Sequence, residues 1–292
     1  MKHALSLVLV LTAACVTNES ATEQDLDTTD GNGQPDNAML GLHYARGEAQ
    51  SSAATPGTPL LWHNGAVMNN AAVQAIYWGT SWASTTYQSD KISGLDTFYG
   101  GLNNTSYMAS NTEYTGSGNT KFTGGISYGG HVIDTSTGPR HAPKTSAIAN
   151  EVCKMISNPV ANGYYPVYTD LPRGHAGYCA WHSYGTCNGV PVQFGFFFDL
   201  NGDPGCDPQS TLAGSQGLTA LANVSGHEIS ETVTDPRSGG WYDSSGAENA
   251  DKCAWTWGNP VTIGGRTWKI QGNFSNAANS TGTGYDGAGC IE

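Results

Sequence analysis

The cysteines constrain the fold of this chain more than any other feature, because their number and setting favour disulfide bonds. There are seven in 292 residues, and the first, Cys15, directly follows an N-terminal apolar run. An even set remains without it, which in an exported chain predicts up to three disulfides. The six members of this set are Cys153, Cys179, Cys187, Cys206, Cys253 and Cys290.

Closeness in the sequence favours some pairings over others. Cys187 is near both Cys179 and Cys206, so either pairing is open, and a Cys253–Cys290 bridge would secure the C-terminal part. No two cysteines have the C-x-x-C spacing of zinc ribbons. A structural zinc site made of thiolates is therefore not expected.

The N-terminus has the pattern of an export signal. Lys2 and His3 precede the run "ALSLVLVLTAA", which ends in small residues at Cys15. The run is too short to span a membrane, so residues 1–15 are predicted to be a signal peptide. "TAAC" also resembles a bacterial lipobox, although Thr12 stands where Leu is usual, so a lipid anchor on Cys15 and ordinary cleavage both stay open.

A polar, acidic stretch follows the signal. Residues 16–58 have no apolar period and are rich in small residues, which is typical of a flexible tether or a short propeptide. The remainder, residues 59–292, shows no internal repeat and is predicted to form one domain.

Composition and charge exclude one class of partner. Only 12% of the residues are charged, Gly is abundant at 39, and the formal net charge is −12. Nucleic-acid binding needs a basic face, so nucleic acid is not expected as a partner. The composition suits a loop-rich extracellular protein, in agreement with the export signal.

Apolar periodicity predicts alternating strands and helices over residues 59–292. The chain is therefore expected to be a single disulfide-bonded, secreted α+β domain, with a mixed sheet packed against helices. Strands are expected at 71–79, 121–134, 164–171 and 190–200, with shorter ones near 266–274, and helices at 85–102, 144–157 and 217–236.

The stretch "SGHEISETVTDP" (225–236) lies on the last of these helices and resembles a zinc-hydrolase motif. Residues four apart project from one helix face, so His227 and Glu231 point the same way. In H-E-x-x-H enzymes such a pair binds zinc, and the intervening Glu activates water. Here the pair would be His227 and Glu231, with Glu228 as the general base.

A third ligand is required. Asp235 lies at the end of the helix, whereas Glu248 and Asp251 would approach from a separate segment. His131, His175 and His182 are further donors. The competing interpretation is an exposed acidic helix, on which Glu228 and Glu231 are merely solvated.

The longer pattern "SGHEISETVTDP…GWYD…GAENADKC" resembles the phosphate-induced protein, or EXORDIUM, family. Members carry a His-Glu-x-x-Glu helix, an Asn-Pro or Asp-Pro stop, an aromatic turn and a Glu-x-x-Asp-x-Cys element. The resemblance spans about residues 70–290 and is strong over 225–253. The matching positions are His227, Glu228, Glu231, Asp235, Pro236, Trp241, Tyr242, Glu248, Asp251 and Cys253, with Cys179 and His182 upstream.

This resemblance implies a secreted, cell-surface protein and a bipartite metal site that joins the helix to Glu248 and Asp251. It does not supply an enzymatic activity. The segment "FFFDLNGDPGCDP" (196–208) has no counterpart in the family pattern, and Ala180 stands where the family has Gly.

Other chemistries have weaker support. Asp199, Asn201, Asp203 and Asp207 occupy positions 1, 3, 5 and 9 of a calcium-loop count, but Pro204 replaces the usual Gly. The alternative is an Asx-rich turn after a strand. No G-x-S-x-G motif supports a serine nucleophile, whereas paired carboxylates for glycoside hydrolysis stay open.

Two functional hypotheses follow. The first is a secreted or surface-anchored zinc hydrolase, most simply a metallopeptidase, that acts on an extracellular peptide or a cell-envelope substrate. The second is a non-catalytic protein of the cell envelope in which the acidic cluster is a structural metal site or none. A variant without Glu228 that still binds the metal but has lost its activity would favour the first hypothesis.

Overall fold

The computed structural model describes residues 34–48 and 57–292. The predicted signal peptide, with Cys15, and most of the predicted tether lie outside these residues. Among the helices of the described part, none is long and apolar enough to cross a membrane.

The centre of the fold is a six-stranded mixed sheet in the order β1-β6-β7-β5-β3-β4. The β3–β4, β3–β5 and β5–β7 pairs are parallel, whereas β6 pairs antiparallel with both β7 and β1. The strands are β1 Leu40–Tyr44, β3 Ala71–Trp78, β4 Ile126–Asp134, β5 Gly163–Pro172, β6 Tyr178–Cys187 and β7 Val190–Asp199. The predicted combination of helices with one mixed sheet is therefore confirmed, although the α+β domain expected from the sequence contains three parallel strand pairs.

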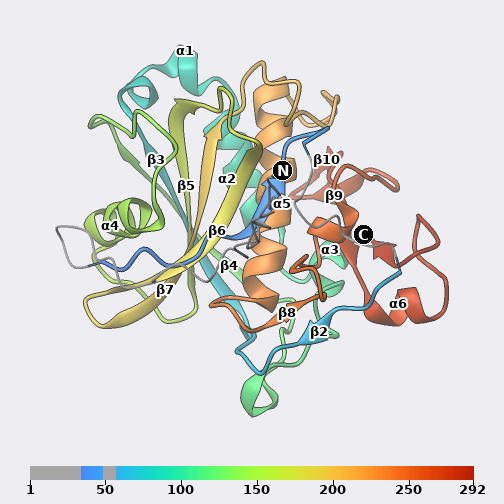
Figure 1. Cartoon of the computed structure of the whole chain (residues 1–292). Helices are drawn as coiled ribbons and strands as arrows, with labels where there is room; N and C mark the ends of the chain where they lie inside the picture. Colours follow the sequence, from blue (N-terminus) through green and yellow to red (C-terminus); the bar gives the residue numbers. More distant parts are fainter. Residues whose placement is uncertain (1–33, 49–56) are drawn as a thin grey trace, which may run out of the picture.

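Helices cover both faces of this sheet. Figure 1 shows α4 (Thr145–Met155) on one face, and α2 (Lys91–Gly101) and α5 (Gln216–Thr234) on the other. The C-terminal segment packs on the far side of α5. It contains β9 (Val261–Ile263), paired with β10 (Arg266–Trp268), and β11 (Asn273–Phe274), paired with β12 (Cys290–Ile291).

Short elements complete the described chain, and most of them connect the larger ones. β2 (Leu61–Trp62) pairs with β8 (Trp241–Tyr242) and so links the start of the continuous part to the segment after α5. The others are η1 Thr80–Ala83, α1 Thr85–Gln88, α3 Ser106–Ala109, η2 Ser117–Asn119, η3 Asp251–Cys253 and α6 Asn276–Ser280.

The helix α5 is buried on every side. Ser215 caps its N-terminus by accepting a hydrogen bond from the Leu218 N–H, and it ends at Asp235, because the residue before Pro236 is pushed out of the helical region. The predicted apolar side is buried against the sheet layer, but the polar side is equally covered by the C-terminal segment. The alternative of an exposed, solvated helix is therefore wrong.

Most predicted elements are confirmed within a few residues, with three differences. The helix expected at 85–102 is two helices, α1 and α2, because Ser89 has a left-handed φ of 49°. Strand β6 was not predicted. Residues 40–44 fall in the predicted tether but form β1 of the central sheet.

The described residues contain three disulfides, which is the full number predicted from the six cysteines: Cys153–Cys187, Cys179–Cys206 and Cys253–Cys290. The predicted Cys253–Cys290 bridge is confirmed. The pairings of Cys187 with Cys179 or Cys206 are wrong, since Cys179 and Cys187 lie at opposite ends of β6. The length of β6 keeps Cys179 and Cys187 apart, and their closeness in the sequence does not reveal this.

Candidate metal centre

Helix α5 brings His227 and Glu231 together as their four-residue spacing predicts. His227 Nε2 lies 3.1 Å from Glu231 Oε2. Asp251 approaches from η3, with its Oδ1 3.6 Å from the same His227 nitrogen. One atom from each of the three residues falls in a group spanning less than 4.8 Å. Of the three candidates for a third ligand, the structure therefore favours Asp251.

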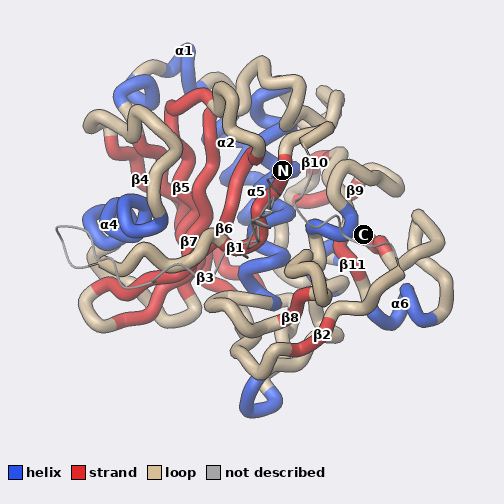
Figure 2. Tube along the Cα trace, viewed as in Figure 1, coloured by secondary structure: helices blue, strands red, loops and turns tan. Residues whose placement is uncertain are grey.

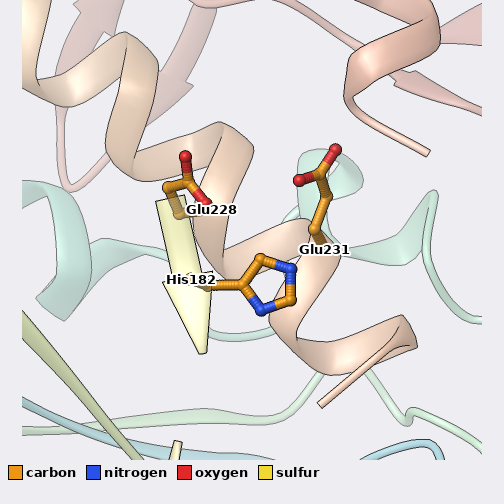
Figure 3. A group of neighbouring side chains, drawn as sticks. All are labelled: His182, Glu228 and Glu231. Atoms are coloured by element: carbon orange, nitrogen blue, oxygen red, sulfur yellow. The ribbon is translucent and has the colours of Figure 1, made fainter. Parts of the chain in front are cut away.

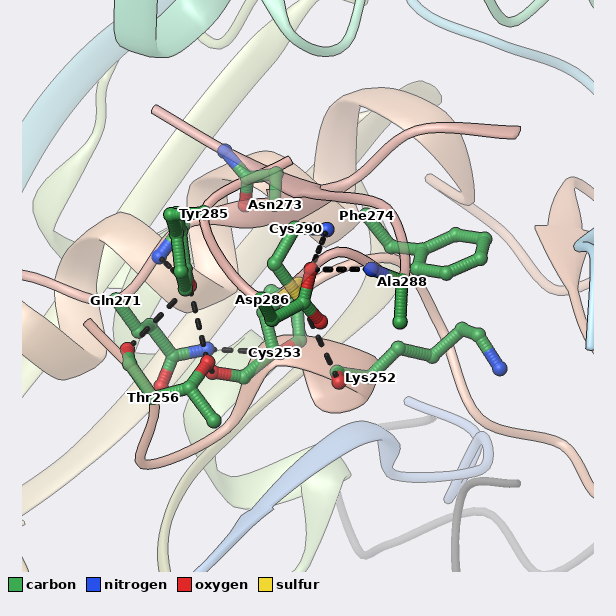
Figure 4. The surroundings of a disulfide bond; sticks show 12 residues. Lys252, Cys253, Thr256, Gln271, Asn273, Phe274, Tyr285, Asp286, Ala288 and Cys290 are labelled. Carbon is green, nitrogen blue, oxygen red and sulfur yellow. Dashed lines mark hydrogen bonds between the residues drawn. A yellow bond between two sulfur atoms is a disulfide. The ribbon is translucent and has the colours of Figure 1, made fainter. Parts of the chain in front are cut away.

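The segment that carries Asp251 is firmly placed. The Asp251 N–H donates to Glu231 Oε1 at 2.8 Å, and Asp251 Oδ2 accepts from the Glu248 N–H at 3.0 Å. The Cys253–Cys290 disulfide then ties the end of η3 to β12, and Asp286 Oδ1 accepts the Cys290 N–H (Figure 4). These contacts fix the distance between the helix and its downstream ligand.

A second group overlaps the first. His182 on β6 joins Glu228 and Glu231 in a cluster of the same size, and Figure 3 shows its ring extending from β6 beside the helix that carries the two glutamates. His182 Nε2 also lies 3.3 Å from Glu248 Oε1. Glu248 therefore belongs to the surroundings of the centre through His182 and not to the group around His227.

Asp235 does not join either group. Its Oδ1 accepts a hydrogen bond from the Gly240 N–H at 2.8 Å, which closes the turn after α5. Of the other histidines considered as donors, His175 is exposed, and His131 pairs with Asp96 at 2.9 Å. Asp235 thus has a structural role in ending the helix.

The cluster fits a zinc ion by its chemistry. An imidazole nitrogen and two carboxylate oxygens are ligands that zinc accepts in open catalytic sites. His227 Nε2, Glu231 Oε2 and both Glu228 oxygens are buried without a hydrogen-bond partner in the described structure. Buried polar atoms are normally paired, because an unpaired one costs desolvation energy. A cation is the partner that would satisfy several of them at once.

The electrostatics of the cluster point the same way. Burial lowers the pKa of His227 and of His182 to about 3. Burial raises the pKa of every carboxyl group here well above its usual value, and the neighbouring carboxylates add to the effect; the groups are Glu228, Glu231, Glu248 and Asp251. A nearby positive ion would reverse this by favouring the carboxylates.

Sequence reasoning missed two neighbours of His227. His43, from β1, places its Nδ1 2.7 Å from His227 Nδ1, and Gln271 Nε2 lies 2.9 Å from the same atom while donating to Ala250 O. If His227 Nε2 is the ligand, its Nδ1 contacts two further groups that fix the orientation of the ring, as the second nitrogen of ligand histidines usually does. No local pattern marks His43, because only the β1–β6 pairing brings it here.

A pocket of about 310 Å³ opens beside the cluster. It lies between β1 and residues 235–251, and Glu248 and Asp251 line it. The other members of the cluster do not reach its wall. The centre therefore borders the pocket through Asp251, whereas His227, Glu228 and Glu231 do not line it.

The residues of the predicted calcium loop have other partners in the structure. Its residues belong to the described chain, yet they form no convergent group of carboxylates, because each carboxylate has another partner. These partners are Lys91 Nζ for Asp199 at 3.8 Å, Arg173 Nη2 for Asp203 at 3.0 Å and the Gln209 N–H for Asp207 at 2.7 Å. Asp199 also accepts the Asn201 N–H, so the Asx-rich turn describes the segment.

Comparison of the chain with protein-family models, curated proteins and solved structures gives no match. The resemblance to the EXORDIUM family therefore stays a prediction. What the centre can do must be argued from its own geometry.

Proposed function

We propose that the protein is a secreted or surface-anchored, zinc-dependent hydrolase, most simply a peptidase. The observation that carries the proposal is the convergence of His227, Glu231 and Asp251 next to a buried Glu228 carboxyl group whose two oxygens are unpaired. The three disulfides support export, since such bonds persist in oxidising compartments.

The roles follow from position. His227, Glu231 and Asp251 would hold the metal, which when bound supplies polarisation of a carbonyl and acidification of water. Glu228, one residue after His227 on α5, would accept a proton at a carboxylate oxygen from the attacking water and pass it to the leaving amine. His182 lies close to Glu228 and Glu231 and contacts Glu248, so it belongs to the surroundings of the metal site.

The test separates metal binding from proton transfer. Glu228→Gln should keep the metal but lower hydrolysis of fluorescein-labelled casein by about 10²- to 10⁴-fold, the contribution of a general base. Glu231→Gln, the matched control, should lose both metal and activity. Metal content is measured by elemental analysis. Hydrolysis unaffected by Glu228→Gln and by chelation would refute the proposal.

A structural metal site is the second candidate, and one observation favours it. His227, Glu228 and Glu231 are fully buried, and structural sites are closed. In that case chelation should lower the thermal stability of the protein, while no hydrolytic activity is present to be lost.

A further inference from the structure

Strand β1 lies directly against the metal centre. It pairs with β6, the strand that carries His182, and Leu40 lies opposite His182 in the register. Figure 2 shows β1 at this side of the sheet, next to α5. Without β1, the β6 edge beside the centre would be free, and a free strand edge is a template for another extended chain.

The point of closest approach is a glycine. Gly41 has a left-handed φ of 51°, and a Cβ atom added to it would overlap Glu231 Oε2 and lie 2.8 Å from His182 Nε2. The register of β1 on β6 shifts between Leu40 and His43, so the strand bulges at this point. Only a residue without a side chain can pass the Glu231 and His182 side chains here.

In this position β1 closes the centre. The metal-facing atoms of His227, Glu231 and Glu228 are buried, and the adjoining pocket reaches only Glu248 and Asp251. His43 of β1 adds a direct contact to His227. A substrate carbonyl therefore cannot meet these side chains while β1 is in place.

We propose that β1 occupies the place of the substrate. On this proposal, which rests on the proposed function, the protein acts on extended peptides that pair with β6 and carry glycine at the position facing Glu231 and His182. The chain holds its own copy of such a peptide, and the centre opens when β1 leaves.

The contacts around β1 suit a replaceable strand, because many use its backbone. Trp255 Nε1 donates to the Tyr44 carbonyl, and the Ala45 N–H donates to the Gly177 carbonyl. Any extended peptide offers these groups. Just after β1, the Arg46 side chain adds a contact of its own, because its guanidinium lies 4.8 Å from the Trp255 ring. Selectivity would come from the glycine and from the histidine two residues later.

The test is peptide binding to the full chain, measured by fluorescence anisotropy. The probe is a labelled peptide with the sequence of residues 37–46, NAMLGLHYAR, and a second probe has Ala in place of its Gly. In the wild-type protein β1 competes at high effective concentration, so binding is weak. Gly41→Ala should displace β1 and tighten the apparent Kd of the glycine peptide at least about tenfold, but not that of the alanine peptide.

Gly47→Ala is the matched control. Gly47 also has a positive φ, 83°, but a Cβ there meets nothing within 4 Å, so this variant should bind like the wild type. A second opening variant, Arg46→Ala, loosens β1 without touching the centre and should tighten binding in the same direction. It decides the question if Gly41→Ala does not fold.

The proposal is overturned if folded Gly41→Ala and Arg46→Ala bind no better than the wild type, or if the two peptides bind equally. Because the readout is binding, it is independent of catalysis. Glycine-selective binding without hydrolysis would support the strand proposal and refute the hydrolase. Casein hydrolysis without peptide binding would do the reverse.

Discussion

Replacing Asp251 by Asn should change the stability of the protein in opposite directions with and without zinc. Asp251 Oδ1 faces His227 Nε2 at 3.6 Å, and Oδ2 accepts the Glu248 N–H. Asn has the same shape and keeps an oxygen that can accept this hydrogen bond. The substitution therefore removes mainly a negative charge from a buried cluster that also contains Glu231.

The size of each effect can be estimated. In the metal-free protein, removing one of several buried like charges should stabilise the fold by about 1–3 kcal/mol. At about 2–4 °C per kcal/mol for a domain of this size, the Tm rises by roughly 2–12 °C. With zinc, losing a charged ligand should weaken binding by about 100-fold, which lowers the stabilisation by zinc by roughly 2.7 kcal/mol.

The assay is thermal unfolding in EDTA and in excess zinc. Asp243→Asn is the matched control, because Asp243 is also buried but pairs with Lys252 at 2.9 Å and accepts the Ser245 and Ala247 N–H groups. This control should lose stability in both conditions. The reasoning fails if Asp251→Asn lowers the Tm in EDTA as Asp243→Asn does, or leaves the zinc effect unchanged.

Two further predictions concern pH and the disulfides. Burial, with the neighbouring Asp134 carboxylate, raises the pKa of Glu151 from 4.5 to about 7. The contribution of Glu151 to stability should therefore be fully present below pH 4.5 and be lost as pH rises through 7, by about 3 kcal/mol. In urea unfolding, Glu151→Gln should lack this part of the pH dependence. Replacing Cys253 and Cys290 by alanine should lower the free energy of unfolding by about 4 kcal/mol, because the unfolded chain gains loop entropy. It should also weaken zinc binding, measured by titration, at least about tenfold, because η3 is released.

The chain contains a matched control for the disulfide prediction. Cys153–Cys187 closes a loop of 34 residues, against 37 for Cys253–Cys290, so its removal should cost a similar free energy. It joins α4 to β6 and does not anchor η3. Equal loss of zinc affinity in both double variants would contradict a specific role for the C-terminal bridge.

The sequence predicts best what depends on local spacing. His227 and Glu231 share a face because helix geometry places residues four apart about 40° from one another, and the stop at Asp235-Pro236 follows from the restriction before proline. The sequence gives Asp251 only as one of three candidates for the third ligand, because η3 reaches α5 through tertiary contacts that no local periodicity encodes.

The residues whose place at the centre was not predicted all reach it through pairing of strands that are far apart in the sequence. His43 and Gly41 lie in the short apolar stretch AMLGLHYA (38–45), which is surrounded by polar residues and was assigned with them to the tether, yet strand pairing with β6 places them at the centre. His182 was one of several further donors and a matching position of the family pattern, but its place at the centre was not predicted because β6 was not predicted. Its burial pattern is nearly continuous and not alternating, since both faces of this strand are covered.

Helix α5 has no face turned to solvent, and this restricts how its sequence can change in length. A single residue inserted before His227 would rotate every following side chain by about 100°. Residues that now face the sheet would then face the C-terminal segment, and the ligands would point at neither His182 nor Asp251. The length of chain between Ser215 and His227 is therefore as much a part of the centre as the ligands themselves.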